Sequence, residues 1–415
     1  MIKEKSNKVD NSIPNGWIVP IGWKLEKFKD ITDILKCGIA STPTYVEKGV
    51  PFLSSQNVKE NRINLEKYNY ISEEYHEFLT KNNKPKKGDI LYTRVGANFG
   101  LAAVSNLDFE YSIYVSLTHI RMKEGYNSTF YSYMLNSDRY RNLARRSVFQ
   151  GGGVPNLNVK IVENFNMLIP PLKEQEKIAE ILSTWDSAIE KQEQLIEKKK
   201  EFKKGLMQRL LSGEVRFKEF TDKWKPLMIK DIANSISELN KADEELIVLS
   251  CTKYDGLVES LKYFGKQMFS DDTSKYKKIW KNDFAYATNH IEEGSIGVQR
   301  ICDVGLVSPM YTVFRVDDEI VDIDYLFYLL KTERYISIYK SRMCASVDRR
   351  GSLRWPEFSK IKLILPSIEE QKRITEVLKS ADKEIELLEK ELEALKLQKK
   401  GLMQRLLTGE VRVKV

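Results

Sequence analysis

The sequence has few of the residues that form metal sites or disulfide frameworks. Its 415 residues include only four cysteines and three histidines. None of the cysteines shows Cys-x-x-Cys spacing, which argues against a zinc site and a disulfide framework. The four cysteines are Cys37, Cys251, Cys302 and Cys344, and we expect all of them to be reduced and buried. The histidines lie far apart without companion ligands, so a structural role is favoured over a catalytic or metal-binding one for His76, His119 and His290.

Long apolar runs are also absent. No stretch of about 18 apolar residues occurs, and the chain starts with the polar segment MIKEKSNKVDN rather than the apolar region of a secretory signal. We therefore expect no membrane span, no membrane partner and a cytoplasmic location. The 67 Lys and Arg residues against 59 Asp and Glu give a net charge of +8, which is compatible with a nucleic-acid partner without requiring one.

The common catalytic motifs are missing too. The chain has no glycine-rich phosphate loop ending in Lys-Ser or Lys-Thr, no dinucleotide fingerprint and no Asn-Pro-Pro-aromatic motif of an amino-methyltransferase. The sequence therefore predicts no catalytic residue, no metal site and no cofactor bound by this chain. A stand-alone nuclease or methyltransferase would instead be active as the purified chain with Mg²⁺ or S-adenosylmethionine.

What the sequence does contain is a long internal repeat. The block GLMQRLL begins at Gly205 and again at Gly401, and the similarity extends without a gap from Pro170–Arg216 to Pro366–Arg412, with more than half of the positions identical. A period near 200 residues is far longer than a solenoid repeat, so each copy should hold a folded domain. We expect pseudo-twofold symmetry.

The repeated block predicts a long helix in each copy. Ser367 and Glu370 suggest a capping box, and glycines at 213 and 409 suggest the ends. Gly205 and Gly401 inside the helices suggest a bend or a close backbone contact. Apolar residues follow the spacings of 3 and 4 that are typical of a coiled-coil seam, more strictly in the second copy, where Lys399 is the one polar position. The seam residues are Leu182, Trp185, Ile189, Ile196, Leu206 and Leu210, with Leu378, Ile385, Leu388, Leu392, Leu395, Leu402 and Leu406.

A helix of about 40 residues extends roughly 60 Å and needs a long partner to cover its apolar seam. Because both helices lie in one chain, the simplest arrangement packs them against each other as an antiparallel pair. The alternative is that each helix pairs with a helix of another chain.

The remaining segments are rich in short β-type runs, turn residues and aromatics, which is typical of mixed α/β domains. We predict an α/β (α+β) protein with two globular domains, residues 1–169 and 218–365, each followed by a long helix in residues 170–217 and 366–415. Residues 1–13 are expected to be flexible. Faint matches, such as Tyr133 with Tyr328, suggest one shared domain fold.

Each globular domain carries basic residues interleaved with aromatics and glycines. Such clusters suit phosphate contacts by Lys and base contacts by Arg, Asn and Gln, although surface lysines are more often only solvated. In the first domain the candidates for DNA contact are Lys84, Lys86, Lys87, Arg94, Asn98, Arg141, Arg145, Arg146 and Gln150. In the second they are Lys275, Lys277, Lys278, Asn289, Arg349, Arg350 and Arg354.

Several phrases of the sequence resemble a known family. Ile169-Pro170-Pro171-Leu172-x-Glu174-Gln175, its second copy at Leu365 to Ile374, and the two GLMQRLL endings are similar to the specificity subunits of type I restriction-modification enzymes. The resemblance covers nearly the whole chain. Gly88-Asp89-Ile90-Leu91 with Arg94-x-Gly96 also resembles the first recognition domain of that family, whereas the second domain has Ala287-Thr288-Asn289 where Arg-x-Gly is expected.

This resemblance implies a DNA-recognition and scaffolding role without catalysis. Two target recognition domains would each read one half of a bipartite, asymmetric site in double-stranded DNA, and the helix pair would set the spacer between the halves. The helices would also dock two methyltransferase subunits, which use S-adenosylmethionine, and restriction subunits, which use ATP and Mg²⁺. A pure coiled-coil scaffold is the remaining alternative, and it predicts no salt-dependent affinity for DNA.

Overall fold

The computed structural model describes residues 17–96, 98–148, 156–241, 244–344 and 351–415, and the chain divides into two compact units. The first unit comprises Met1–Glu193 and Lys390–Val415, and the second comprises Gln194–Glu389. Each unit therefore combines one globular part with half of each long helix. The repeat predicted a division at the ends of the helices, but the compact units divide both helices near their middle.

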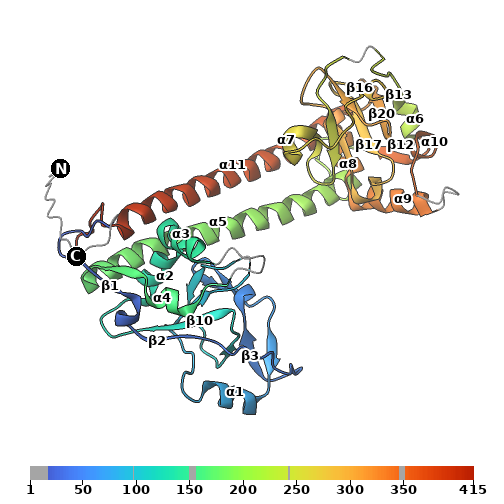
Figure 1. The fold of residues 1–415 in the computed structure, drawn as a ribbon. Helices are drawn as coiled ribbons and strands as arrows, with labels where there is room; N and C mark the ends of the chain where they lie inside the picture. Colours follow the sequence, from blue (N-terminus) through green and yellow to red (C-terminus); the bar gives the residue numbers. More distant parts are fainter. Residues whose placement is uncertain (1–16, 97, 149–155, 242–243, 345–350) are drawn as a thin grey trace. The chain divides into compact units, whose positions relative to one another are not determined.

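The first unit is built around a four-stranded antiparallel sheet with the strand order β2-β10-β7-β8 (Figure 1). A smaller sheet, β6-β3-β9, includes one parallel pair, and β1 pairs with β11 and β4 with β5. The bounds are β1 (Lys24–Lys27), β2 (Thr32–Cys37), β3 (Val50–Leu53), β4 (Val58–Lys59), β5 (Arg62–Ile63), β6 (Asn69–Ile71), β7 (Ile90–Thr93), β8 (Ala102–Val104), β9 (Ser112–Ile113), β10 (Leu117–Met122) and β11 (Asn166–Ile169).

The second unit repeats this plan. Its four-stranded antiparallel sheet has the order β13-β20-β17-β18, and the pair β12-β21 corresponds to β1-β11. The pairs β14-β15 and β16-β19 are particular to this unit. The bounds are β12 (Lys225–Met228), β13 (Ala233–Ile236), β14 (Leu249–Thr252), β15 (Gly256–Glu259), β16 (Lys277–Trp280), β17 (Phe284–Ala287), β18 (Ile296–Val298), β19 (Val304–Val307), β20 (Tyr311–Val316) and β21 (Lys362–Leu365). The shared sheet order confirms the prediction of one domain fold.

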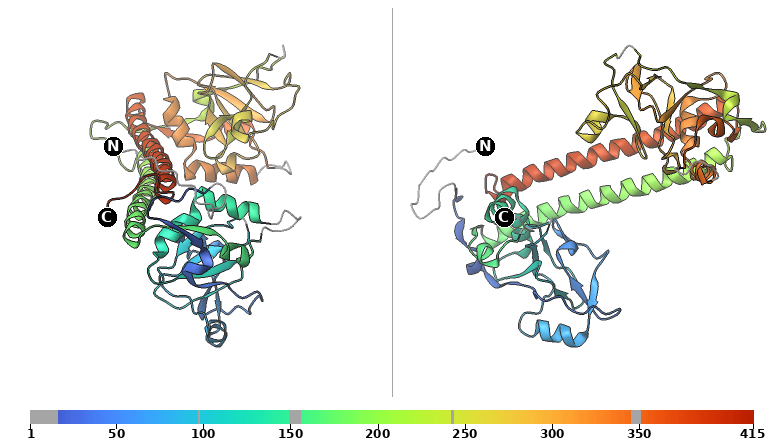
Figure 2. Two further views of the ribbon diagram at one scale, coloured as in Figure 1. Left: turned by 60° about the vertical axis from the view of Figure 1, so that its left-hand side comes forward. Right: turned by 45° about the vertical axis from the view of Figure 1, so that its right-hand side comes forward.

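Of the six shorter helices described in each unit, the first and the last three hold equivalent places between the strands. In the first unit they are η1 (Phe28–Ile31), η2 (Ser55–Asn57), α1 (Glu73–Thr80), α2 (Ser128–Asn136), α3 (Asp138–Ser147) and α4 (Val159–Glu163). In the second they are α6 (Ile229–Ile232), α7 (Ser260–Phe264), η3 (Ile291–Glu293), α8 (Ile323–Leu330), α9 (Glu333–Cys344) and α10 (Trp355–Phe358). Helix α1 lies on the side of the first unit away from the first long helix, α5 (Leu172–Ser212), in both views of Figure 2.

The two long helices, α5 and α11 (Ile368–Leu407), pack against each other in both units, as the seam predicts. In the first unit Gln192 donates to Glu391 at 3.1 Å and Asp186 pairs with Lys399, so rising numbers on one helix meet falling numbers on the other. The pairing is therefore antiparallel. All predicted seam residues are buried or half-buried.

Both helices end at a glycine, as predicted. Gly213 and Gly409 have φ values of +76° and +70°, which disfavour residues with a Cβ atom. Inside the helices, a Cβ atom added to Gly205 or Gly401 would meet nothing within 4 Å. The close backbone contact considered for these two glycines is therefore wrong.

The predicted capping box of α11 is only half formed. The Ser367 hydroxyl accepts a hydrogen bond from the backbone N–H of Glu370 at 3.4 Å. The Glu370 carboxylate does not return to the helix start, because it binds the guanidinium of Arg216 and the indole of Trp224 instead. The side chain that was expected to cap its own helix thus ties it to the segment that follows α5.

Candidate nucleic-acid interface

The first candidate surface lies at the carboxyl end of β7, where Arg94 and Asn98 follow the strand. The Arg94 guanidinium donates to the carbonyl oxygen of Leu157 at 2.9 Å, to that of Val115 at 3.3 Å and to the side chain of Asn156 at 3.0 Å. Two of these bonds tie the end of the strand to the residues that follow position 155, and the bond to Val115 ties it to the segment before β10. Arg94 is half-buried, and its hydrogen bonds hold the segments of this surface together.

The basic end of α3 lies beside the same loop. An added Cβ atom on Gly100 would be 3.7 Å from Cβ of Ala144, so the loop after β7 runs against this helix. Arg145 and Arg146 in its last turn are exposed, and Arg145 is bonded to Asn142 at 3.0 Å. Exposed guanidinium groups next to a loop suit contacts with phosphates or base edges.

The side chain of Arg141, on the same helix, lies next to a carboxylate instead. Its guanidinium lies 3.9 Å from the carboxylate of Glu60, one turn before Arg145 on α3. It is half-buried, so it has less freedom to reach a partner than the exposed arginines at the end of the helix.

The three lysines of the first domain lie at the opposite end of β7. Lys84 pairs with Glu110 and Lys87 donates to Asp108 at 2.7 Å, whereas Lys86 is exposed. Because β7 is four residues long, about 13 Å of strand separates this group from Arg94. The structure therefore divides the candidates of the first domain into two groups.

The second unit presents a matching surface at the carboxyl end of β17. Asn289 is exposed just after the strand, and the backbone N–H of Leu353 donates to the carbonyl oxygen of Thr288 at 2.8 Å. In the first unit Leu157 makes the same bond to Arg94, also at 2.8 Å. Thr288 thus occupies the position of Arg94, and the exposed Arg354 follows Leu353.

Lys277 also reaches this end of the sheet. Its ammonium donates to the carbonyl oxygen of Tyr311, which pairs with Ala287 at the end of β17, at 2.5 Å. Burial lowers the pKa of the Lys277 ammonium. Lys278 points elsewhere and pairs with Glu244 and Glu238, while Lys275 is exposed on the loop before β16.

Only some of the candidates thus lie at one equivalent place in both units, the carboxyl end of β7 or β17, and these are Arg94, Asn98, Arg145 and Arg146 in the first unit and Lys277, Asn289 and Arg354 in the second. Three further candidates, Gln150, Arg349 and Arg350, lie outside the described residues. Sequence reasoning found the residue types but could not order them in space.

Sequence reasoning missed a buried charge network at the end of β7 opposite Arg94. Asp89, at the start of β7, accepts from His119 at 2.7 Å and from Nε of Arg121 at 2.8 Å. Burial would raise the pKa of the Asp89 carboxyl, but these hydrogen bonds, with one from the Lys86 backbone, outweigh it and lower the pKa to about 2. In the second unit Asp283 binds Arg315 in the same way, at 2.7 and 2.9 Å. The recurring signal was Asp after Gly or Asn before a strand in both domains.

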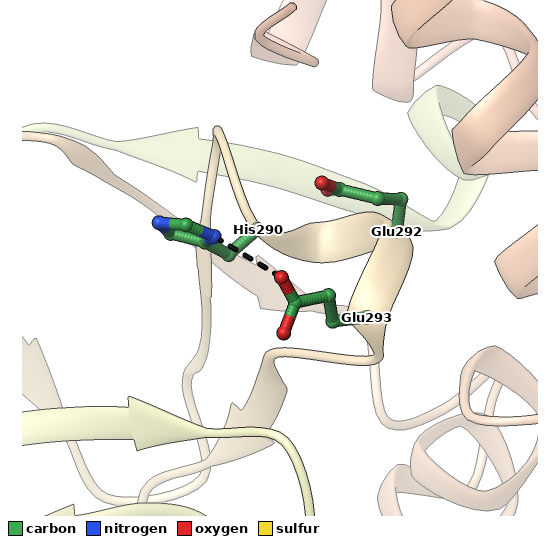
Figure 3. A group of neighbouring side chains, drawn as sticks. All are labelled: His290, Glu292 and Glu293. Atoms are coloured by element: carbon green, nitrogen blue, oxygen red, sulfur yellow. Dashed lines mark ion pairs between the residues drawn. The ribbon is translucent and has the colours of Figure 1, made fainter.

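The histidines are accounted for by local pairs. His119 and His76 are buried, and His76 contacts Ser112 at 2.9 Å and Glu110 at 3.1 Å. His290 is exposed and pairs with Glu293 at 3.5 Å, with Glu292 close by (Figure 3). Figure 3 shows Glu293 turned toward the imidazole across one short turn, an arrangement typical of a surface ion pair, and we assign no metal to it.

The cysteine prediction is wrong for one residue. Cys37 is exposed, like its neighbour Lys36, because both lie at the end of the edge strand β2. Cys251 and Cys302 are half-buried free thiols, and burial raises the pKa of the Cys251 thiol to about 12. The side chain of Cys344 lies outside the described residues.

Two matching surfaces, one per repeat, are the arrangement that the sequence resemblance implied. The family model of the type I restriction modification DNA specificity domain matches residues 20–198 and again residues 221–397. The chain belongs to this family. It is a specificity subunit of a type I restriction-modification system, the non-catalytic DNA-recognition component, and it carries two DNA specificity domains.

Two relatives of the specificity subunit come from Methanocaldococcus jannaschii. The MjaVIII specificity subunit is 27% identical over 421 residues, covering 96% of this chain and 95% of the relative. The putative MjaX specificity subunit is 25% identical, covering 95% of each. The family assignment thus holds along nearly the whole chain.

Solved structures show the same fold. The S subunit from M. genitalium matches with a TM-score of 0.53 at 15% identity, covering 96% of this chain and 98% of that one. A chain from a structure of type I R-M complex assembly and conformational transition matches with a TM-score of 0.57 at 16% identity, covering 95% and 100%. Among the described residues of this specificity subunit, no helix is long and apolar enough to cross a membrane.

Proposed function

We propose that this specificity subunit reads a bipartite, asymmetric DNA target, with one half-site for each recognition domain. The surfaces at the carboxyl ends of β7 and β17 contact the two half-sites. The observation that supports this proposal is their equivalence: in both units some of the candidate residues lie at the carboxyl end of the same strand of the sheet, although the residues themselves differ. Arg94 stands where the second unit has Thr288, so the two half-sites differ in sequence.

Within this proposal the exposed polar and basic side chains contact either phosphates or the edges of bases. Arg145 and Arg146, at the end of α3, and Arg354, beside β17, contact phosphates or guanine edges. Asn289 suits a bidentate contact with adenine. Lys84 and Lys87 exchange their exposed carboxylate partners for phosphates at little cost, because surface ion pairs contribute little.

The helix pair holds the two recognition domains and sets the unread spacer between the half-sites. It also docks two methyltransferase subunits, and restriction subunits complete the enzyme. Exposed apolar side chains on α5 and α11 support a docking role, since Phe202, Leu387 and Leu397 are each more than half exposed to water. S-adenosylmethionine, ATP and Mg²⁺ act in these partner subunits, and this chain binds none of them.

The central experiment maps N6-methyladenine in DNA from cells that express this chain with its cognate methyltransferase. A split motif with two unlike halves is expected. A continuous motif, or methylation without sequence preference, would contradict the proposal.

Exchange of the second domain, residues 218–365, for that of another specificity subunit tests the division of labour. Only one half of the motif should change, because each domain reads its own half-site. A change in both halves would refute modular reading.

Deletion of one matched heptad from each long helix tests the spacer. The spacer should shorten while both half-site sequences stay the same. The opposite result, altered half-sites with the original spacer, would refute the measuring role of the helices.

Salt titration separates DNA recognition from a pure scaffold. A subunit that contacts several phosphates loses affinity steeply as salt rises, whereas a scaffold shows no such dependence. The measurement uses the assembled methyltransferase with target DNA and with DNA lacking the motif.

A further inference from the structure

A cluster of three side chains joins the globular part of the first unit to both long helices. Tyr133 of α2 donates its hydroxyl hydrogen bond to Asp186 of α5 at 2.5 Å. Lys399 of α11 forms an ion pair with the same carboxylate, and its ammonium lies 5.5 Å from the centre of the Tyr133 ring. Lys399 is only 7% exposed. One half-buried carboxylate, whose side chain is 34% exposed, therefore ties three elements together.

The second unit contains the same cluster with the helices exchanged. Tyr328 of α8 donates to Asp382 of α11 at 2.6 Å, and Lys203 of α5 pairs with that carboxylate. The Lys203 ammonium lies 5.3 Å from the Tyr328 ring. Burial and the hydrogen bond to aspartate raise the pKa of both tyrosines, so each hydroxyl stays a donor. We call these two groups the Tyr–Asp–Lys clusters.

Both clusters occupy one antiparallel register of the helices. The residue numbers of Asp186 and Lys399 have the same sum as those of Asp382 and Lys203. Two more exposed pairs, Glu193 with Lys396 and Lys200 with Glu389, likewise have equal sums of residue numbers, although this sum differs from that of the clusters. The contacts in both units therefore fit a single antiparallel register of α5 against α11.

A lysine in an apolar seam selects an alignment rather than adding stability. A buried charge is costly without its partner, whereas an apolar residue packs almost equally well at several registers. After a shift of one heptad, Asp186 would face Leu392 or Leu406. The same shift would place Asp382 opposite Ile196 or Leu210. Either shift leaves a carboxylate against a buried apolar side chain.

We propose that the two Tyr–Asp–Lys clusters determine the register of α5 against α11 and fix each recognition domain at one position along the helix pair. The residues act as positioning residues and contact no DNA. The consequence for target spacing rests on the proposed function. One heptad of helix is about 10 Å, which corresponds to about 3 base pairs.

The test compares three sets of substitutions in the full chain with its methyltransferase. The neutral set, Asp186→Asn, Asp382→Asn, Lys203→Met and Lys399→Met, removes the charges but keeps side-chain length and a tyrosine acceptor. A matched control, Glu193→Gln, Glu389→Gln, Lys200→Met and Lys396→Met, removes as many charges from the exposed pairs. A conservative control, Lys203→Arg with Lys399→Arg, keeps the buried charges.

Disulfide trapping reads the register without DNA. Gln192→Cys with Glu391→Cys reports the native register, because these side chains are hydrogen-bonded at 3.1 Å. Gln192→Cys with Gln398→Cys, or with Glu384→Cys, reports a shift of one heptad in either direction. Peptide mapping separates these disulfides from those of the native cysteines.

In the neutral set, trapping of the shifted pairs should rise about tenfold over the parent chain, which corresponds to ~1.4 kcal/mol of register preference. Helix content by circular dichroism and the Tm should be unchanged or higher, since buried ion pairs often add no net stability. Both control sets should keep the native trapping. Unchanged trapping in the neutral set, or equal trapping in the matched control, would overturn the proposal.

The spacing readout distinguishes this inference from the proposed function. With the neutral set, targets whose spacers are about 3 base pairs shorter or longer should become substrates for methylation. If trapping shifts but spacer choice does not, the register role stands and the measuring role of the helices fails. If the parent chain selects no spacer at all, the proposed function fails independently of the clusters.

Discussion

Glu370 accepts hydrogen bonds from Nε and Nη2 of Arg216 at 2.9 and 2.8 Å, although the two residues belong to different repeats. The carboxylate is 1% exposed and also accepts from the Trp224 indole at 3.2 Å. In the first unit Glu174 accepts in the same way from Arg412 and from Trp23. The start of each long helix is thereby fixed to the segment beyond the end of the other.

Glu370→Ala should therefore destabilise the second unit by about 3 kcal/mol, because it leaves Arg216 and Trp224 without their buried acceptor. Hydrogen exchange and denaturant unfolding measure the loss. Glu214→Ala is the control, since Glu214 is exposed and lies 3.7 Å from Arg209, and it should cost at most about 0.5 kcal/mol. Equal losses in the two variants would contradict this role of Glu370.

The glycines of the long helices should respond in opposite directions to alanine. Gly205→Ala and Gly401→Ala should each stabilise the chain by up to about 1 kcal/mol, because a Cβ atom meets open space and alanine favours helix. Gly409→Ala should destabilise it, since φ is +70° and the added Cβ atom would approach Cγ of Pro20. Thermal unfolding of the three variants gives the comparison, and stabilisation by Gly409→Ala would show that the helix end is not fixed as described.

The charge network at Asp89 should appear in the pH dependence of stability. Its folded pKa, about 2, lies below its ordinary 3.8, so the stabilisation is complete above about pH 4 and is lost as pH falls toward 2. Asp89→Asn should lower the free energy of unfolding by about 2 kcal/mol above pH 4 and by little near pH 2. Urea unfolding from pH 2 to 6 tests this, with the exposed Asp108→Asn as a control that should show no such change. A constant difference across this range would exclude Asp89 as the group responsible.

DNA affinity should depend on the exposed end of α3. Arg146→Ala should weaken binding of the assembled methyltransferase about tenfold and reduce the salt slope by about one, as for one lost phosphate contact. Lys278→Ala serves as the control, because Glu238 and Glu244 already pair with its ammonium. Identical affinities of both variants and the parent would remove α3 from the interface.

The periodic parts of the fold were predictable from the sequence, and the reason is geometric. Apolar spacings of 3 and 4 place residues such as Leu378 and Leu392 on one face of a helix whatever surrounds them, and both are buried. The same pattern marked Lys399 as an interruption of the second seam. It could not show that this lysine meets an aspartate on the other helix.

The candidate interface was predicted less well, because charge type does not specify direction. Lys84 and Arg94 are ten positions apart in a basic region, yet a buried strand places them at opposite ends of the sheet. Arg94 also donates three hydrogen bonds within the chain, which no sequence pattern distinguishes from bonds to DNA. The pairing of Asp89 with His119 depends on the register of β7 against β10 and needed the fold.

The division of the chain also has a consequence for its synthesis on the ribosome. The second unit is one continuous segment, Gln194–Glu389, whereas the first needs Lys390–Val415, including Leu406 and Leu407 of its core. The core of the domain that is made first therefore depends on residues that are synthesised after the whole of the second unit. A chain truncated just after Glu389 would keep the whole segment of the second unit but would lack part of the core of the first.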